Sequence, residues 1–312
     1  MTITQLSYVL AIAEHQNFTK AAKACFVTQP TLSMQIQKLE EELAVQIFDR
    51  SKKPIELTEV GKKIVSQAKN IVNESERIQD IIDQDKGFIG GEYKLGIIPT
   101  VMPTLLPMFL KTFITKYPKV QLKILELTTP QIIKQLNEGH IDAAIAVTPL
   151  VEENIVERPL FYEPFIAYVP HNHRLHSKTK IERTDLDIND ILLLEDGHCF
   201  RDGIINLCSA SKNNHFKKFQ LESGSFETLI KLANENLGMT LLPYLHSKEL
   251  SAKNSENLKH FTDPKPAREV SLLYPKNELK IQITTALKNT IDSIIRGAIA
   301  FHNVQIISPK KK

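Results

Sequence analysis

Hydrophobic residues in the first forty positions follow helical spacing, interrupted by short polar turns. The apolar stripe of a first helix consists of Leu6, Val9, Leu10 and Ala13. Thr19 is placed to cap a second, short helix, and Thr28 to cap a third, whose first turn tolerates Pro30 because no N–H group is needed there. The buried stripe of the third helix consists of Leu32, Ile36 and Leu39. Two short helices joined by a tight turn predict a helix-turn-helix.

The opposite face of the third helix carries short polar side chains, which suit the base edges and phosphates of a DNA major groove. These residues are Gln29, Thr31, Ser33, Gln35 and Lys38. A helix with a solvated polar face would show the same pattern, so the pattern alone leaves both interpretations open. Charge does not decide between them, because residues 1–60 hold six Lys or Arg against seven Asp or Glu.

A longer helical pattern follows Gly61, with apolar positions that alternate steps of four and three residues. The positions are Ile64, Ala68, Ile71, Ser75, Ile78 and Ile82. This spacing is typical of a coiled-coil seam and predicts a dimerisation helix, whereas an amphipathic helix packed on its own domain is the alternative. Three glycines, Gly87, Gly90 and Gly91, then predict a flexible hinge.

Beyond the hinge, short apolar runs alternate with helical patterns, which predicts an α/β domain. The runs expected as strands cover residues 94–98, 120–127, 143–147, 165–169, 191–194, 239–242 and 271–274.

Composition adds limits to this picture. With 312 residues, 42% of them hydrophobic and 24% charged, the chain can form one small and one large domain. No basic stretch precedes a continuous apolar run near the N-terminus, so we expect no signal peptide, no membrane span and a cytoplasmic location. Three cysteines are too few for a disulfide framework. Because no metal-ligand, phosphate-loop or nucleophile motif occurs, we expect no metal, no cofactor and no enzyme.

Five N-terminal segments together resemble the LysR-type transcriptional regulators. They cover residues 18–22, 27–33, 35–40, 48–50 and 57–61. The resemblance implies that the third helix reads DNA and that a wing touches the phosphates. The DNA contacts that it implies are Thr28, Gln29, Pro30, Thr31, Ser33, Gln35, Lys38, Arg50, Lys52 and Thr58. Met34 and Gln37 depart from many relatives, which leaves the operator sequence open.

The same resemblance continues in two segments, 95–100 and 238–243, where an apolar run expected as a strand is followed by a proline. It implies an effector domain of two Rossmann-like lobes with a cleft, crossed by the chain near 161–169 and 264–270. We therefore expect an α+β multidomain protein with a periplasmic-binding-protein-like effector domain. Its expected parts are a winged helix-turn-helix at 1–60, a coiled-coil helix and hinge at 61–90, and the effector domain at 91–312, with lobe I at 91–162 and 268–302 and lobe II at 163–267. The family further implies a homodimer, a homotetramer, a double-stranded DNA operator and contact with RNA polymerase.

A cysteine pair narrows the resemblance. The segment 194–202, LEDGHCFRD, followed by Cys208, is similar to the hydrogen peroxide-sensing branch of this family. A thiol becomes reactive when a cation or a helix N-terminus favours its thiolate. Cys199 precedes a run that can form a short helix, with Arg201 in its first turn, while nearby carboxylates oppose the effect. Two ordinary buried cysteines are the alternative.

Helix geometry restricts how the pair can react. In one continuous helix, nine residues at about 1.5 Å each separate the Cα atoms of Cys199 and Cys208 by about 13 Å. A disulfide needs a separation of about 7 Å or less. Peroxide converts a thiolate to a sulfenic acid, which Cys208 would resolve as a disulfide. We therefore predict that oxidation refolds residues 199–208 and that this rearrangement is the switch.

Four more residues match positions of a peroxide pocket in that branch, namely Thr100, Thr129, His198 and Arg268. Each threonine adjoins a strand end and a proline, where cleft residues are expected, although either hydroxyl can instead cap the next helix. His198 can orient peroxide or be merely solvated, and Arg268 can stabilise the thiolate. Relatives carry another pocket histidine after the second cysteine, where this chain offers Gln220 or His215.

These features predict a transcriptional regulator that responds to hydrogen peroxide, and by resemblance an activator of antioxidant genes. Two other functions use some of the same residues. A LysR-type regulator gated by a small organic metabolite in the cleft would leave the cysteines incidental. A thiol peroxidase would use the same sulfur chemistry, but it would not need a DNA-reading domain.

Overall fold

The computed structural model describes residues 1–85, 89–208, 221–299 and 303–309. Contacts divide the chain into two compact units, Met1–Phe88 and Ile89–Lys312. The first unit has one hydrophobic core and the second has two. Within the described ranges, no helix has both the length and the apolarity needed to cross a bilayer.

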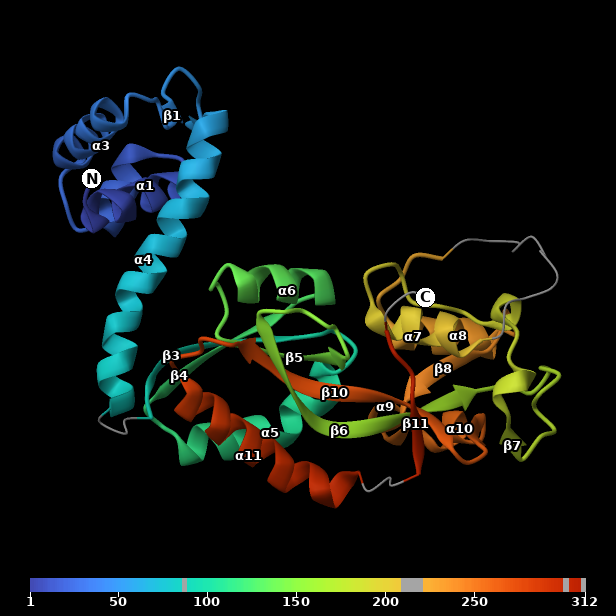
Figure 1. The fold of residues 1–312 in the computed structure, drawn as a ribbon. Helices are drawn as coiled ribbons and strands as arrows, with labels where there is room; N and C mark the ends of the chain where they lie inside the picture. Colours follow the sequence, from blue (N-terminus) through green and yellow to red (C-terminus); the bar gives the residue numbers. More distant parts are fainter. Residues whose placement is uncertain (86–88, 209–220, 300–302, 310–312) are drawn as a thin grey trace. The chain divides into compact units, whose positions relative to one another are not determined.

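The first unit is a winged helix-turn-helix (Figure 1). Its elements are α1 (Ile3–His15), α2 (Phe18–Ala24), α3 (Gln29–Leu43) and the antiparallel wing of β1 (Phe48–Asp49) and β2 (Glu56–Leu57). Thr28 caps α3 as predicted, because its side chain accepts the N–H of Thr31. The predicted cap of α2 was wrong: Asn17, not Thr19, accepts the N–H of Lys20, so the helix begins at Phe18, two residues before the start that a Thr19 cap would give.

The predicted coiled-coil seam lies along helix α4 (Glu59–Asp85), and its two halves differ in burial. Ala68 is buried in the core of the first unit, and Ile64 packs against that core. Ile78 and Ile82, further along, are 62% and 40% exposed. The first half of the helix therefore packs on its own domain, and the second half presents apolar side chains that the unit itself does not cover.

The second unit is built on a mixed sheet with the strand order β4-β3-β5-β10-β6-β9-β7, where β11 also pairs with β10 and β8 with β6. The strands are β3 (Gly91–Ile97), β4 (Val120–Glu126), β5 (Ala143–Thr148), β6 (Ile155–Tyr168), β7 (Lys180–Ile181), β8 (Thr240–Pro243), β9 (Leu258–Phe261), β10 (Lys265–Pro275) and β11 (Val304–Ile306). Strands β3, β4 and β5 run parallel, whereas β6 and β10 pair antiparallel over most of their length.

Helices cover the sheet in two groups. Near the parallel strands, α5 (Met102–Lys116) and α11 (Ile281–Ala298) lie on one side and α6 (Thr129–Asn137) on the other (Figure 1). The second group consists of α7 (Cys199–Leu207), α8 (Phe226–Asn234), α9 (Tyr244–Lys248), α10 (Ala252–Ser255) and the 3-10 turns Arg183–Asp185 and Ile188–Asp190.

Strand β6 joins the two hydrophobic cores of this unit. Ile155 and Phe161 belong to the first core, and Phe165 and Tyr168 belong to the second. With its partner β10 it forms the connection between the lobes, in the regions where the sequence predicted the crossings. The strand predicted at 191–194 was wrong, because only a single bridge between Ile191 and Met239 forms there.

Candidate functional site

Cys199 lies where the two lobes meet. It is the first residue of α7 and only 6% exposed. Its side chain belongs to the core that the parallel strands form, whereas Phe200, the next residue, packs in the other core. A rearrangement of α7 would therefore change the packing of both lobes.

Arg268 on β10 forms a buried polar network beside this cysteine. Its Nε and Nη2 donate to Glu163 Oε2 at 2.9 and 2.7 Å. Its Nη1 donates to the hydroxyl of Thr100 at 2.9 Å, and Nη2 donates to the Thr100 carbonyl at 3.0 Å. The guanidinium also lies 5.1 Å from the centre of the Phe200 ring. Two residues predicted from sequence, Arg268 and Thr100, are thus in direct contact.

Glu163 is a member of this network that the sequence analysis missed. It is 1% exposed, and its second oxygen accepts the N–H of Leu245 at 2.8 Å. The available signal was an acidic residue among the apolar positions of the second half of β6, since a carboxylate is rarely buried without a partner.

Thr129 places a buried hydroxyl near the Cys199 sulfur. The hydroxyl acts on this thiol as a hydrogen-bonding group, and among the described residues its Oγ1 has no other hydrogen-bond partner. It does not cap α6, because Thr128 does so in a capping box with Gln131. A hydroxyl can donate one hydrogen bond and accept two, so this group keeps hydrogen-bonding capacity for a small polar ligand.

Burial dominates the protonation of Cys199. It raises the pKa of the thiol above its ordinary value, although the Arg268 guanidinium, the Thr129 hydroxyl and the Val147 backbone act to lower it. Asp202 raises the pKa further. The reduced site therefore favours a protonated thiol at neutral pH. Arg201, the cation expected from sequence, instead donates to the Leu194 carbonyl and pairs with Asp196.

Cys208 follows the last residue of α7, and no disulfide joins it to Cys199. The helix is continuous over Cys199–Leu207, so its rise separates the two Cα atoms by about 13 Å. The far end of α7 is held by hydrogen bonds. Arg183 donates to the carbonyls of Leu207 and Asn206 at 2.6 and 2.8 Å, and the Asn206 amide donates to the Ser308 carbonyl at 2.8 Å.

His198 is buried beside the same helix, not solvated. It is 6% exposed, and its Nε2 lies 3.5 Å from Glu195 Oε1. The two alternatives for a further pocket residue, Gln220 and His215, lie outside the described residues.

The residues predicted to contact DNA differ in their availability. Seven of them are exposed, namely Thr28, Gln29, Pro30, Thr31, Lys38, Arg50 and Lys52, whereas Ser33, Gln35 and Thr58 are partly buried. Arg50 forms an ion pair with Glu40 at 2.7 Å. The Thr58 hydroxyl donates to the Gln46 carbonyl and accepts the N–H of Gly61, so it stabilises the start of α4.

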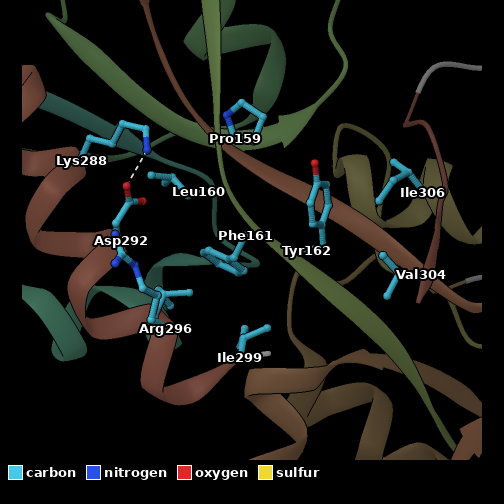
Figure 2. Close-up of a pocket in the computed structure, with 11 residues that line it drawn as sticks. Pro159, Leu160, Phe161, Tyr162, Lys288, Asp292, Arg296, Ile299, Val304 and Ile306 are labelled. Atoms are coloured by element: carbon cyan, nitrogen blue, oxygen red, sulfur yellow. Dashed lines mark hydrogen bonds and ion pairs between the residues drawn. The ribbon is translucent and has the colours of Figure 1, made fainter. Parts of the chain in front are cut away.

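A separate pocket of about 670 Å³ lies between β6, α11 and β11 (Figure 2). It combines apolar side chains with Arg296 and the ion pair of Lys288 and Asp292. No residue predicted from sequence lines it. The described part of the chain also contains no cluster of three or more His, Cys, Asp or Glu that could bind a metal.

Two family models match the chain. "Bacterial regulatory helix-turn-helix protein, lysR family" matches residues 3–62, and "LysR substrate binding domain" matches residues 86–292. A hydrogen peroxide-inducible genes activator of Dickeya chrysanthemi is 34% identical over 277 residues, which are 88% of this chain and 89% of that protein.

Solved structures give the same relationship. Full-length OxyR of Pseudomonas aeruginosa, in a mutant form, matches with a TM-score of 0.75 and 32% identity, covering 94% of this chain and 98% of that one. A hydrogen peroxide-bound OxyR mutant of Corynebacterium glutamicum matches with a TM-score of 0.61 and 28% identity, covering 95% and 93%. Together with the two-lobed fold and the cysteine site, these matches show that the chain belongs to the LysR family of bacterial regulators, in its OxyR branch.

Proposed function

We propose that this protein is a cytoplasmic, DNA-binding transcriptional regulator that is switched by hydrogen peroxide and activates antioxidant genes. The observation that carries the proposal is the buried Cys199, beside Arg268 and the buried Thr129 hydroxyl, at the opposite end of a helix from Cys208. In this proposal residues 1–60 bind the operator, residues 61–90 pair two subunits and residues 91–312 sense peroxide.

The chemistry begins at the sulfur of Cys199. The thiolate attacks one peroxide oxygen, the O–O bond breaks, and the products are a sulfenic acid and hydroxide. Arg268 and Thr100 stabilise the anionic sulfur and the departing oxygen, and Thr129 hydrogen-bonds the peroxide. The Cys208 thiolate then attacks the sulfenic sulfur, forming the disulfide and releasing hydroxide, which becomes water when it takes up a proton. His198 orients the peroxide from the N-cap of α7.

The DNA-binding part of the proposal rests on the exposed face of α3 and on the wing. Side chains at the start of α3, among them Gln29 and Thr31, are exposed and can reach base edges, and Lys52 can reach a phosphate. Pairing through the exposed Ile78 and Ile82 would place two reading units on one operator, which increases affinity through effective concentration. A homotetramer, contact with RNA polymerase and activation of transcription follow from the resemblance to the family.

The experiment that tests this function is disulfide mapping by mass spectrometry before and after stoichiometric peroxide, in wild type and in Cys199→Ser. We expect rapid linkage of Cys199 to Cys208, reversed by dithiothreitol and missing in the variant. Unreacted thiols at both positions would contradict a peroxide switch. The chain would then be a regulator gated by another ligand, such as a small organic metabolite.

Replacing Thr129 by Val tests the peroxide pocket. The two side chains have nearly the same shape, but valine cannot donate a hydrogen bond. Losing one bond to the reacting peroxide costs about 1.5 kcal/mol, so sulfenic acid should form roughly tenfold more slowly. Stopped-flow trapping of the sulfenic acid measures the rate, with Thr128→Val as the control on the neighbouring cap. An unchanged rate in Thr129→Val would remove this hydroxyl from the mechanism.

A further inference from the structure

The buried cation of this site, Arg268, interacts with three other residues, namely Glu163, Thr100 and Cys199. Arg268 contacts Glu163 through two nitrogens and Thr100 through two, and it is also the main charged group that lowers the pKa of Cys199. Arg268 and Glu163 are 2% and 1% exposed, so water screens their charges little.

Glu163 holds Arg268 in a fixed orientation. Its Oε2 receives both Nε and Nη2 of the guanidinium, while its Oε1 is fixed by the N–H of Leu245 at the start of α9. The carboxylate is therefore anchored to β6 and α9 together, and it leaves Nη1 directed to Thr100. A buried cation that already has a counter-ion stabilises a second anion less than a free cation does.

We infer that Glu163 is a positioning residue of the redox site, whose carboxylate orients Arg268 toward Thr100 and sets how strongly Arg268 can stabilise the Cys199 thiolate. The inference rests on the proposed function and deepens it. Glu163 touches neither the sulfur nor the peroxide site, and it acts only through the arginine. In this arrangement the carboxylate keeps the sensor less reactive than the cysteine and arginine alone would make it.

Other titratable groups lie near Cys199, Arg268 and Glu163, on the elements that pack against these three residues. Asp202 on α7 raises the pKa of Cys199. His246 on α9 lies within reach of both Glu163 and Arg268, and burial lowers its pKa, so it is neutral at pH 7 and does not substitute for either charge. His198 at the N-cap of α7 faces Glu195. Glu163 is therefore the anion in direct contact with Arg268, and its removal is the change that tests the inference.

The test measures alkylation of Cys199 by iodoacetamide as a function of pH, in a chain where Cys25 and Cys208 are replaced by Ser. We compare this chain with the same chain carrying Glu163→Gln. Glutamine keeps an oxygen that can accept the N–H of Leu245, but it removes the negative charge. The pH midpoint of alkylation should fall by about one unit or more, which makes the reaction at pH 7 roughly tenfold faster. Alkylation requires neither peroxide nor DNA, so failure here is distinct from failure of the proposed function.

The matched control is Glu157→Gln on the same strand, where the carboxylate accepts the N–H groups of Leu150 and Val151 and is not in contact with Arg268. Its midpoint should equal that of wild type. If Glu163→Gln does not fold, Glu163→Asp replaces it. The shorter carboxylate cannot keep all three contacts, so a smaller shift in the same direction is expected. A midpoint that stays in place or rises in the folded variant overturns the inference.

Discussion

Replacing Arg268 by Gln is expected to lower the free energy of unfolding by about 3–5 kcal/mol, because it leaves the buried Glu163 carboxylate without its counter-ion. The same change removes the main charge that lowers the pKa of Cys199, while burial still raises it. Alkylation of Cys199 at pH 7 should therefore slow at least about tenfold, the effect of one pKa unit. Urea unfolding and the pH dependence of alkylation measure the two effects.

Two variants separate the buried charge from general damage. In the double variant Arg268→Gln with Glu163→Gln, neither buried charge remains, so much of the lost stability should return. Alkylation of Cys199 should remain slow, because the arginine is still missing. Arg158→Gln is the control on β6, because Arg158 is exposed and stacks on Tyr274, away from the Arg268–Glu163 pair in the contacts of the described residues. It should change stability by no more than about 0.5 kcal/mol. A stable Arg268→Gln protein with wild-type alkylation would show that the arginine does not act on the sulfur.

Replacing Arg183 by Ala should accelerate the second step of oxidation and leave the first unchanged. Cys208 can reach Cys199 only if the last turn of α7 unwinds, and Arg183 holds that turn through the carbonyls of Leu207 and Asn206. A hydrogen bond from a charged donor is worth about 1.5–3 kcal/mol, so disulfide formation should become at least about tenfold faster. Quenched-flow alkylation followed by mass spectrometry resolves the sulfenic acid from the disulfide.

Arg174→Ala provides the control for this prediction. Arg174 pairs with Asp190 and donates to the Asp185 carbonyl, and neither of these contacts involves the carbonyls at the end of α7. In the Arg174→Ala variant, the disulfide between Cys199 and Cys208 should form at the wild-type rate. If Arg183→Ala forms the disulfide at the wild-type rate or more slowly, unwinding of the last turn of α7 does not limit the switch.

The sequence by itself determined the features that depend on neighbouring residues. The helix-turn-helix was predictable because apolar spacing and the Thr28 cap act within one or two turns. The helix that separates Cys199 from Cys208 was predictable as well, because its apolar spacing is local, and the rise of a helix fixes the separation of their Cα atoms. The motif around Cys199 also led to Thr100 and Arg268, which are in contact in the folded chain.

Only the tertiary structure decided the electrostatics of the site and the restraint on α7. Glu163 and Arg268 are 105 residues apart, and they meet because β6 and β10 pair across the lobes. Arg183 reaches Leu207 across 24 residues, and no local pattern predicts that contact. The pKa of Cys199 followed the same rule. The nearby residues left the balance between thiol and thiolate open, whereas burial, which depends on the whole fold, raises the pKa of the thiol.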